Sequence, residues 1–125
     1  MRPAAFLPAI LLCACAAPAP YTAPAAAGRS SAELARLLVA SEAKQFPCTI
    51  MGVKGVELEG KKSEVTLLPG RYQVTLHCSS GFHEVKPQAE VLARAGKRYM
   101  LTAYFVDDSI TIFNMKMRVR VAELP

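Results

Sequence analysis

The sequence predicts an all-β protein, a small antiparallel β-sandwich, on three observations. Beyond Pro47, apolar residues recur at every second position, which is the period of a strand with one buried face. About seven such short runs are separated by turn-forming residues, a spacing typical of a sandwich. The chain has 125 residues, a length that suits one hydrophobic core and not two.

The expected strands follow one another between short turns. In chain order they cover residues 48–53 continued by 55–58, 65–68, 72–78, 89–94, 98–106, 110–113 and 115–121. Pro69-Gly70-Arg71 favours a type II turn, whose twist fits a tight hairpin poorly, so a wider or bulged connection is expected there. In Ala95-Gly96-Lys97, the glycine supplies the positive φ that a tight hairpin turn needs.

The alternation assigns each side chain to a face of its strand. The residues expected to face the core are Tyr72, Val74, Leu76, Cys78, Tyr99, Leu101, Ala103, Phe105, Met115, Met117, Val119 and Val121. Those expected to face outward are Arg71, Gln73, Thr75, His77, Lys116, Arg118 and Arg120. The last three form a basic row with about 6.6 Å between neighbours.

The start of the chain has the features of an export signal. Arg2 precedes a strongly apolar run, residues 4–17, of about 14 residues, whereas a membrane-spanning helix needs roughly 20. A basic start, a short apolar middle and small residues behind it describe a secretory signal peptide. Leu12-Cys13-Ala14-Cys15 resembles the bacterial lipoprotein box, in which Cys15 would be the residue that takes the lipid.

This resemblance implies a processed and membrane-anchored protein. The bond before Cys15 is cut, the thiol receives a diacylglycerol and the new amino group is acylated, and two or more acyl chains hold a protein firmly. Ala16, in place of the aspartate typical of inner-membrane retention, implies the outer membrane, with the protein facing the periplasm. Ordinary cleavage at Ala14-Cys15-Ala16 is the alternative and gives a soluble periplasmic protein. Removal of residues 1–14 leaves 111 of the 125 residues, and loss of Arg2 lowers the formal net charge from +5 to +4.

Two segments are expected between the signal and the sandwich. Residues 15–29 are rich in proline and alanine and are predicted to be an extended tether. Ser30 and Glu33 have the spacing of a helix capping box, and leucines follow at spacings of three and four until Pro47. Residues 30–46 are therefore predicted to form a short amphipathic helix, which lies against its own domain or binds a partner.

Short motifs in the strand region resemble a known class of envelope domain. Residues 50–55, the segment Leu68-Pro69-Gly70-Arg71-Tyr72 and the segment Gly96-Lys97-Arg98-Tyr99 are similar to motifs in small bacterial lipoprotein domains of the transthyretin-like or PEGA-like kind. The resemblance implies an immunoglobulin-like or transthyretin-like sandwich over residues 47–125 and a non-enzymatic module. Function must still be argued from a site, because one fold hosts many functions.

Cys48 and Cys78 are the two thiols that remain after processing. In an oxidising periplasm such a pair is expected to form a disulfide. A metal site with His77 and His83 is an alternative, but the spacing matches no common zinc pattern. Free thiols are the third possibility, and we expect no metal and no cofactor.

The remaining sequence features favour binding over catalysis. Motifs for a nucleophile turn, a zinc protease or a phosphate loop are lacking in the sequence, and Ser79 and Ser80 near the two histidines are weak evidence for an active site. Export and the lack of a dense basic and aromatic cluster argue against nucleic acid. The row formed by Lys116, Arg118 and Arg120 can bind anionic groups on lipopolysaccharide, peptidoglycan or an envelope protein, or it can be a charged edge strand that prevents aggregation.

Overall fold

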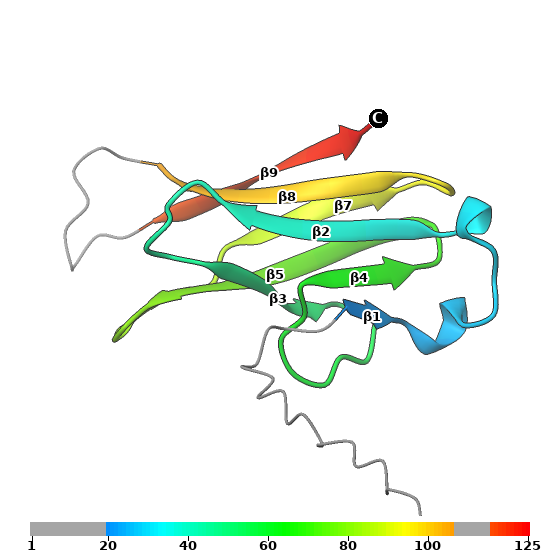
Figure 1. Cartoon of the computed structure of the whole chain (residues 1–125), viewed down its shortest axis with the longest axis horizontal. Coiled ribbons are helices and arrows are strands. Elements are labelled where there is room, and N and C mark those ends of the chain that lie inside the picture. Colours follow the sequence, from blue (N-terminus) through cyan, green and yellow to red (C-terminus); the bar gives the residue numbers. More distant parts are fainter. Residues whose placement is uncertain (1–19, 107–115) are drawn as a thin grey trace, which may run out of the picture.

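Two β-sheets packed face to face form the protein in a computed structural model that describes residues 20–106 and 116–125 (Figure 1). The predicted all-β sandwich is confirmed. The first sheet has the strand order β1 (Pro20–Thr22), β4 (Glu64–Leu67), β2 (Ala35–Ser41), β8 (Arg98–Phe105) and β9 (Met117–Leu124). In the second sheet, β5 (Gly70–Ser80) has β3 (Cys48–Val53) on one side and both β6 (His83–Val85) and β7 (Gln88–Ala93) on the other.

Strand pairing in the first sheet differs from the purely antiparallel prediction. β1 runs parallel to β4, and β2 runs parallel to β8, whereas the other pairs are antiparallel. The parallel pairs are possible because the chain changes sheet repeatedly, from β2 to β3, from β4 to β5 and from β7 to β8. The connection within each parallel pair passes through the second sheet, since β3 comes between β1 and β4 along the chain, and β3, β5, β6 and β7 come between β2 and β8.

Neither of the two expected turns closes a hairpin. The Pro69 turn leads from β4 in the first sheet to β5 in the second, and the Gly96 turn leads from β7 back to β8. The two strands that flank each turn belong to different sheets and do not pair with each other. Each turn therefore crosses from one sheet to the other at the end of the core. Residues 55–58 also differ from the prediction, because this segment contributes only a bridge between Val53 and Val56.

The predicted helix over residues 30–46 is wrong. Only a single 3-10 turn, η2 (Ser31–Glu33), forms there, and Ser30 makes no side-chain capping bond. The chain then becomes strand β2, whose residues Ala35 and Leu37 are fully buried. The leucine spacing fitted a helix, but this segment pairs with strands on both sides, and such tertiary contacts override a weak helical preference.

The folded part also begins earlier than predicted. Pro20–Thr22 is strand β1, and it is followed by the 3-10 turn η1 (Pro24–Ala26). Ala23 and Ala26 are buried, so small residues that were assigned to a tether fill the edge of the core. The sandwich starts at Pro20 and not at residue 47, and residues 15–19 lie outside the described part of the chain.

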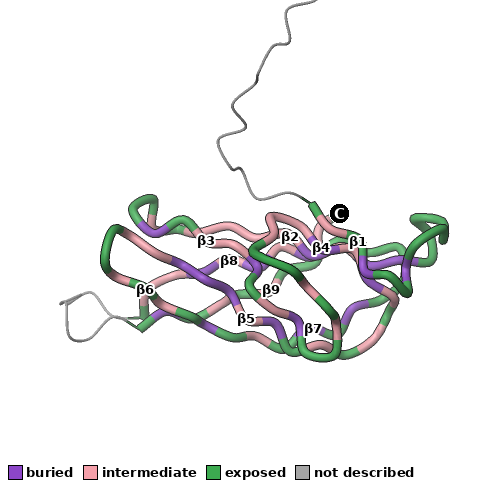
Figure 2. The backbone as a smooth tube through the Cα atoms, turned by 90° about the horizontal axis from the view of Figure 1, so that it is seen from below, coloured by how far each residue is buried: buried purple, intermediate pink, exposed green. Residues whose placement is uncertain are grey.

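The predicted inward faces are confirmed for the described strands. Val74, Leu76, Cys78, Leu101 and Ala103 are all fully buried. Figure 2 shows buried positions along strands such as β5 and exposed positions in the loops at the ends. Residues 110–113 and Met115, also predicted as strand positions, lie outside the described residues. Over residues 20–106 and 116–125, no helix is long and apolar enough to cross a membrane.

Candidate functional site

The disulfide predicted between Cys48 and Cys78 is present. The two residues are directly opposite each other on the neighbouring strands β3 and β5, with their Cα atoms 4.1 Å apart. Cys78 is fully buried, so the bond lies at the core side of the second sheet. No group of three or more metal-ligating side chains occurs in the described parts of the chain. The bond is a structural crosslink, and it fixes the second sheet.

The predicted basic row lies at the edge of the first sheet. β9 is the last strand of that sheet, and Arg118 and Arg120 are exposed on its outer side, whereas Lys116 precedes the strand. Arg120 donates from Nη1 to Glu42 Oε2 at 2.9 Å and lies over the Tyr104 ring, 4.7 Å from its centre. The bond to Glu42 also raises the pKa of Arg120. One of the three predicted ligand-binding residues is therefore already paired within the protein.

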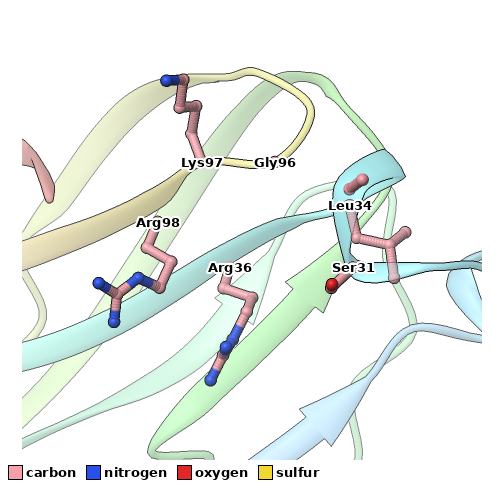
Figure 3. A pocket seen from close by; sticks show the side chains of 7 residues that line it. Ser31, Leu34, Arg36, Gly96, Lys97 and Arg98 are labelled. Carbon is pink, nitrogen blue, oxygen red and sulfur yellow. The ribbon is translucent and has the colours of Figure 1, made fainter. Parts of the chain in front are cut away.

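A second basic site on the same outer face was not predicted. A hollow of about 360 Å³ opens where η2 meets the turn between β7 and β8 (Figure 3). Its lining contains three cations and no acid. The lining residues are Ser31, Ala32, Leu34, Arg36, Gly96, Lys97 and Arg98. In Figure 3 the side chains of Arg36 and Arg98 extend to the same side, while that of Lys97 points away from them.

The backbone sets the distance between the two arginines. Arg36 on β2 and Arg98 on β8 are direct partners in the parallel register, so their side chains leave the sheet on the same face. The main-chain N–H of Arg36 donates to the Lys97 carbonyl at 3.0 Å, which fixes the start of this pairing. Neighbouring strands lie about 4.8 Å apart, so the two side chains leave the sheet side by side, with Arg36 turned toward Glu64 on β4 and Arg98 toward Pro125 after β9.

At one side of the hollow, the backbone of Gly96 lies close to the backbone of Ala32 and Leu34. Its N–H donates to the Leu34 carbonyl at 2.8 Å, and its φ of +76° is in the region that favours glycine. A Cβ atom at this position would lie 3.4 Å from the Ala32 carbonyl oxygen. The turn therefore packs closely on η2, and the positive φ of residue 96 is what favours glycine there.

The two arginines are incompletely neutralised. Arg36 uses Nε and Nη2 to bind one oxygen of Glu64, at 3.0 and 2.9 Å. Arg98 donates from Nη2 to the main-chain oxygen of Pro125 at 3.0 Å. With Lys97 beside them, three cations line the hollow, and among the ion pairs that the structure describes for these three, Glu64 is the side-chain carboxylate that binds one of them, Arg36.

Sequence reasoning missed this site because it placed Arg36 on a helix and the Gly96 turn in a hairpin. Both assignments separated Arg36 from Arg98. A signal was available, since Ala35, Leu37 and Val39 alternate with polar or outward residues as in a strand. That pattern does not identify the partner strand, and the pairing of β2 with β8 became evident only in the structure.

The outer face of the second sheet is different, because two pairs of polar side chains bond within it, although the buried Thr49 hydroxyl opposite His77 has no described partner. Gln73 donates from Nε2 to Gln88 Oε1 at 3.0 Å, and His77 Nε2 lies 2.7 Å from Glu84 Oε2. The bond from His77, followed by the charge of Lys86, lowers the pKa of Glu84. His77, predicted to face solvent, is on the outer side but is largely covered. This face carries paired polar groups and no comparable excess of positive charge.

Comparison with known proteins gives no match: no family model, curated sequence or solved structure is significantly similar to this chain.

Proposed function

We propose that this protein is a lipid-anchored outer-membrane lipoprotein whose β-sandwich faces the periplasm and binds or scaffolds an anionic envelope component, without enzymatic activity. The observation that carries the proposal is Leu12-Cys13-Ala14-Cys15 directly ahead of a folded unit that starts at Pro20. The Cys48–Cys78 disulfide supports export, because such bonds persist in oxidising compartments.

The early start of the sandwich gives the anchor a short reach. Pro20 follows Cys15 by five positions, and a fully extended chain spans at most about 3.6 Å per residue, or about 18 Å here. A domain anchored through Cys15 is therefore held against the membrane surface. The tether of residues 15–29 expected from the sequence would have allowed a much larger distance.

The non-enzymatic part of the proposal is supported by how the histidine on β5 is used. His77 pairs with Glu84 rather than with Ser79 or Ser80, which were the serines considered as nucleophiles. Gln73 and Gln88 also pair with each other on this face, whereas the hollow lined by three cations lies on the other sheet. Binding of anions is the activity that this distribution supports best.

Mass analysis of the mature protein tests the anchor. We expect a chain that starts at Cys15 and carries the mass of a diacylglycerol and an amide-linked acyl chain. A Cys15→Ala variant is expected in the soluble fraction, with Cys13→Ala as the matched control that stays in the membrane. A mature chain that starts at Ala17 without lipid would establish the alternative, a secreted soluble periplasmic binding domain.

A further inference from the structure

We infer that the hollow at Arg36 and Arg98 is a binding site for a phosphate ester group. This inference names the ligand class of the proposed binding module and in that respect rests on the proposed function. It starts from the register of the first sheet, in which the two arginines are direct cross-strand partners. Like charges at neighbouring positions of a sheet repel each other, so an anion that contacts both side chains would stabilise this pair.

The acid that the protein provides meets only part of this need. Glu64 accepts both of its described bonds from Arg36 through one oxygen, Oε2. Arg98 donates one bond, from Nη2 to the main-chain oxygen of Pro125, the last residue of the sequence, and it has no ion pair with an Asp or Glu side chain among those described. A guanidinium has five N–H donors, and the bonds described here use two from Arg36 and one from Arg98. Several charge-bearing donors are left for a ligand.

The arrangement of these donors fits a phosphate better than a carboxylate. Arginine binds phosphate oxygens through two parallel N–H groups. Two arginines on separate strands can each bind a different pair of oxygens on one tetrahedral phosphate. A carboxylate has only two oxygens, and one arginine already satisfies them. The added charge of Lys97 at the rim also favours a ligand with more than one negative charge.

The size of the hollow matches a small group on a larger molecule. Its volume of about 360 Å³ is near the lower end of the range of about 300–1,000 Å³ for small-molecule sites. Ser31 adds a hydroxyl and Leu34 an apolar surface to the lining. The hollow is at the end of the sandwich that carries η2, away from the β5–β6 hairpin (Figure 1).

The anchor brings this hollow near a source of phosphate. β1, which contains Pro20, belongs to the same sheet and lies three strands from β8, or about 15 Å at the usual spacing. An acylated Cys15 lies within about 18 Å of Pro20. Phospholipid headgroups and soluble phosphate esters share the required chemistry, and the experiment separates these two sources.

The test uses the unacylated mature chain, residues 15–125 with Cys15→Ser, so that any binding is independent of the lipid. Its probes are glycerol phosphate in calorimetry, and sedimentation with vesicles of phosphatidylcholine alone or with an equal part of phosphatidylglycerol. We expect binding to at least one phosphate probe and none to acetate or to phosphatidylcholine alone. Arg36→Gln and Arg98→Gln should each weaken binding about tenfold, as expected for loss of a charge-assisted bond.

Arg71→Gln is the matched control, because it removes the same charge from an exposed position on β5, in the other sheet. It should change the affinity less than about twofold, and Arg36→Lys should restore only part of the binding because it keeps charge without the planar donor pair. Thermal unfolding checks that each variant folds. Binding of glycerol phosphate identifies a free ester as sufficient, and binding of vesicles alone identifies the lipid headgroup.

The inference is overturned if neither phosphate probe binds, if acetate binds equally well, or if Arg71→Gln weakens binding as much as Arg98→Gln. None of these results affects the mass of the mature protein or its attachment through Cys15. Failure of the phosphate site and failure of the lipoprotein proposal are therefore recognised separately.

Discussion

The outer faces of the two sheets differ in how their charges are used. On the second sheet, Gln73 pairs with Gln88, and His77 pairs with Glu84. On the first sheet, arginines occupy both ends of the face, and residues such as Leu38 and Met100 lie opposite each other between them. The arginines are Arg36, Arg98, Arg118 and Arg120, and the acids paired with them are Glu64 and Glu42. The second-sheet face contains two internal polar pairs, whereas the first-sheet face has four arginines and two paired acids, and the proposed anion site rests on this difference.

The two sheets are also stabilised differently, and removal of the disulfide tests this with the largest expected effect. Replacing Cys48 and Cys78 together by serine should lower the free energy of unfolding by about 3–4 kcal/mol, because the bond closes a loop of about 30 residues in the unfolded chain. Urea unfolding of the oxidised protein and the double variant measures the loss. The wild-type protein under reducing conditions is the control and should match the variant.

The same double variant tests whether phosphate binding at the first sheet depends on the disulfide in the second. Because the disulfide joins β3 to β5 in the second sheet, the variant should retain its affinity for the phosphate probe while it remains folded. Equal stability of the two proteins would show that the bond contributes little. A parallel loss of phosphate affinity in the folded variant would show that the two sheets are not independent.

A smaller effect is expected where the turn between β7 and β8 meets η2. Gly96→Ala forces a side chain into a left-handed conformation, which costs about 1–2 kcal/mol. The added Cβ also touches the Ala32 carbonyl oxygen, at 3.4 Å, so a backbone shift that relieves the strain at residue 96 also displaces the rim of the hollow. Urea unfolding should show the lower stability, and titration with glycerol phosphate should show a lower affinity.

Gly81→Ala is the matched control for that prediction. Gly81 also has a positive φ, at +60°, but a Cβ there meets no atom within 4 Å. It should lose stability by a similar amount and retain phosphate affinity. If both variants bind equally well, the close approach at Gly96 does not shape the site.

Sequence reasoning identified the fold class, the disulfide and the faces of most strands because each depends on local pattern. Alternation alone places Leu76 and Cys78 inside, and it also separates Arg118 from Met117. The pairing of strands depends on contacts between distant segments, and local pattern does not report these. Leucine spacing near Leu37 fitted a helix equally well, and this ambiguity concealed the arginine pair.

Glu64→Gln tests whether the first-sheet face is short of negative charge. The change removes the carboxylate that pairs with Arg36 at 2.9 Å, and a half-exposed pair of this kind contributes only about 0–1 kcal/mol to folding. Stability should therefore change little, whereas affinity for glycerol phosphate should rise severalfold because an internal competitor is gone. Glu42→Gln, which removes the partner of Arg120 instead, is the control and should leave the affinity unchanged.

Weaker phosphate binding by Glu64→Gln would mean that Glu64 positions Arg36 rather than competing with the ligand.

The smallest effect is expected from the paired face, in the pH dependence of stability. The hydrogen bond from His77 holds the pKa of Glu84 below its ordinary value, so folding favours the ionised carboxylate. This contribution is present above the ordinary glutamate pKa of about 4.3 and is lost as the pH falls through the lower folded-state pKa. Urea midpoints measured from about pH 6 to about pH 3 should fall less steeply for Glu84→Gln than for the wild type.

Glu90→Gln, which makes the same change on the same face opposite Gln73, is the control. Identical slopes for the wild type and Glu84→Gln would show that the pairing of His77 with Glu84 does not complete this face.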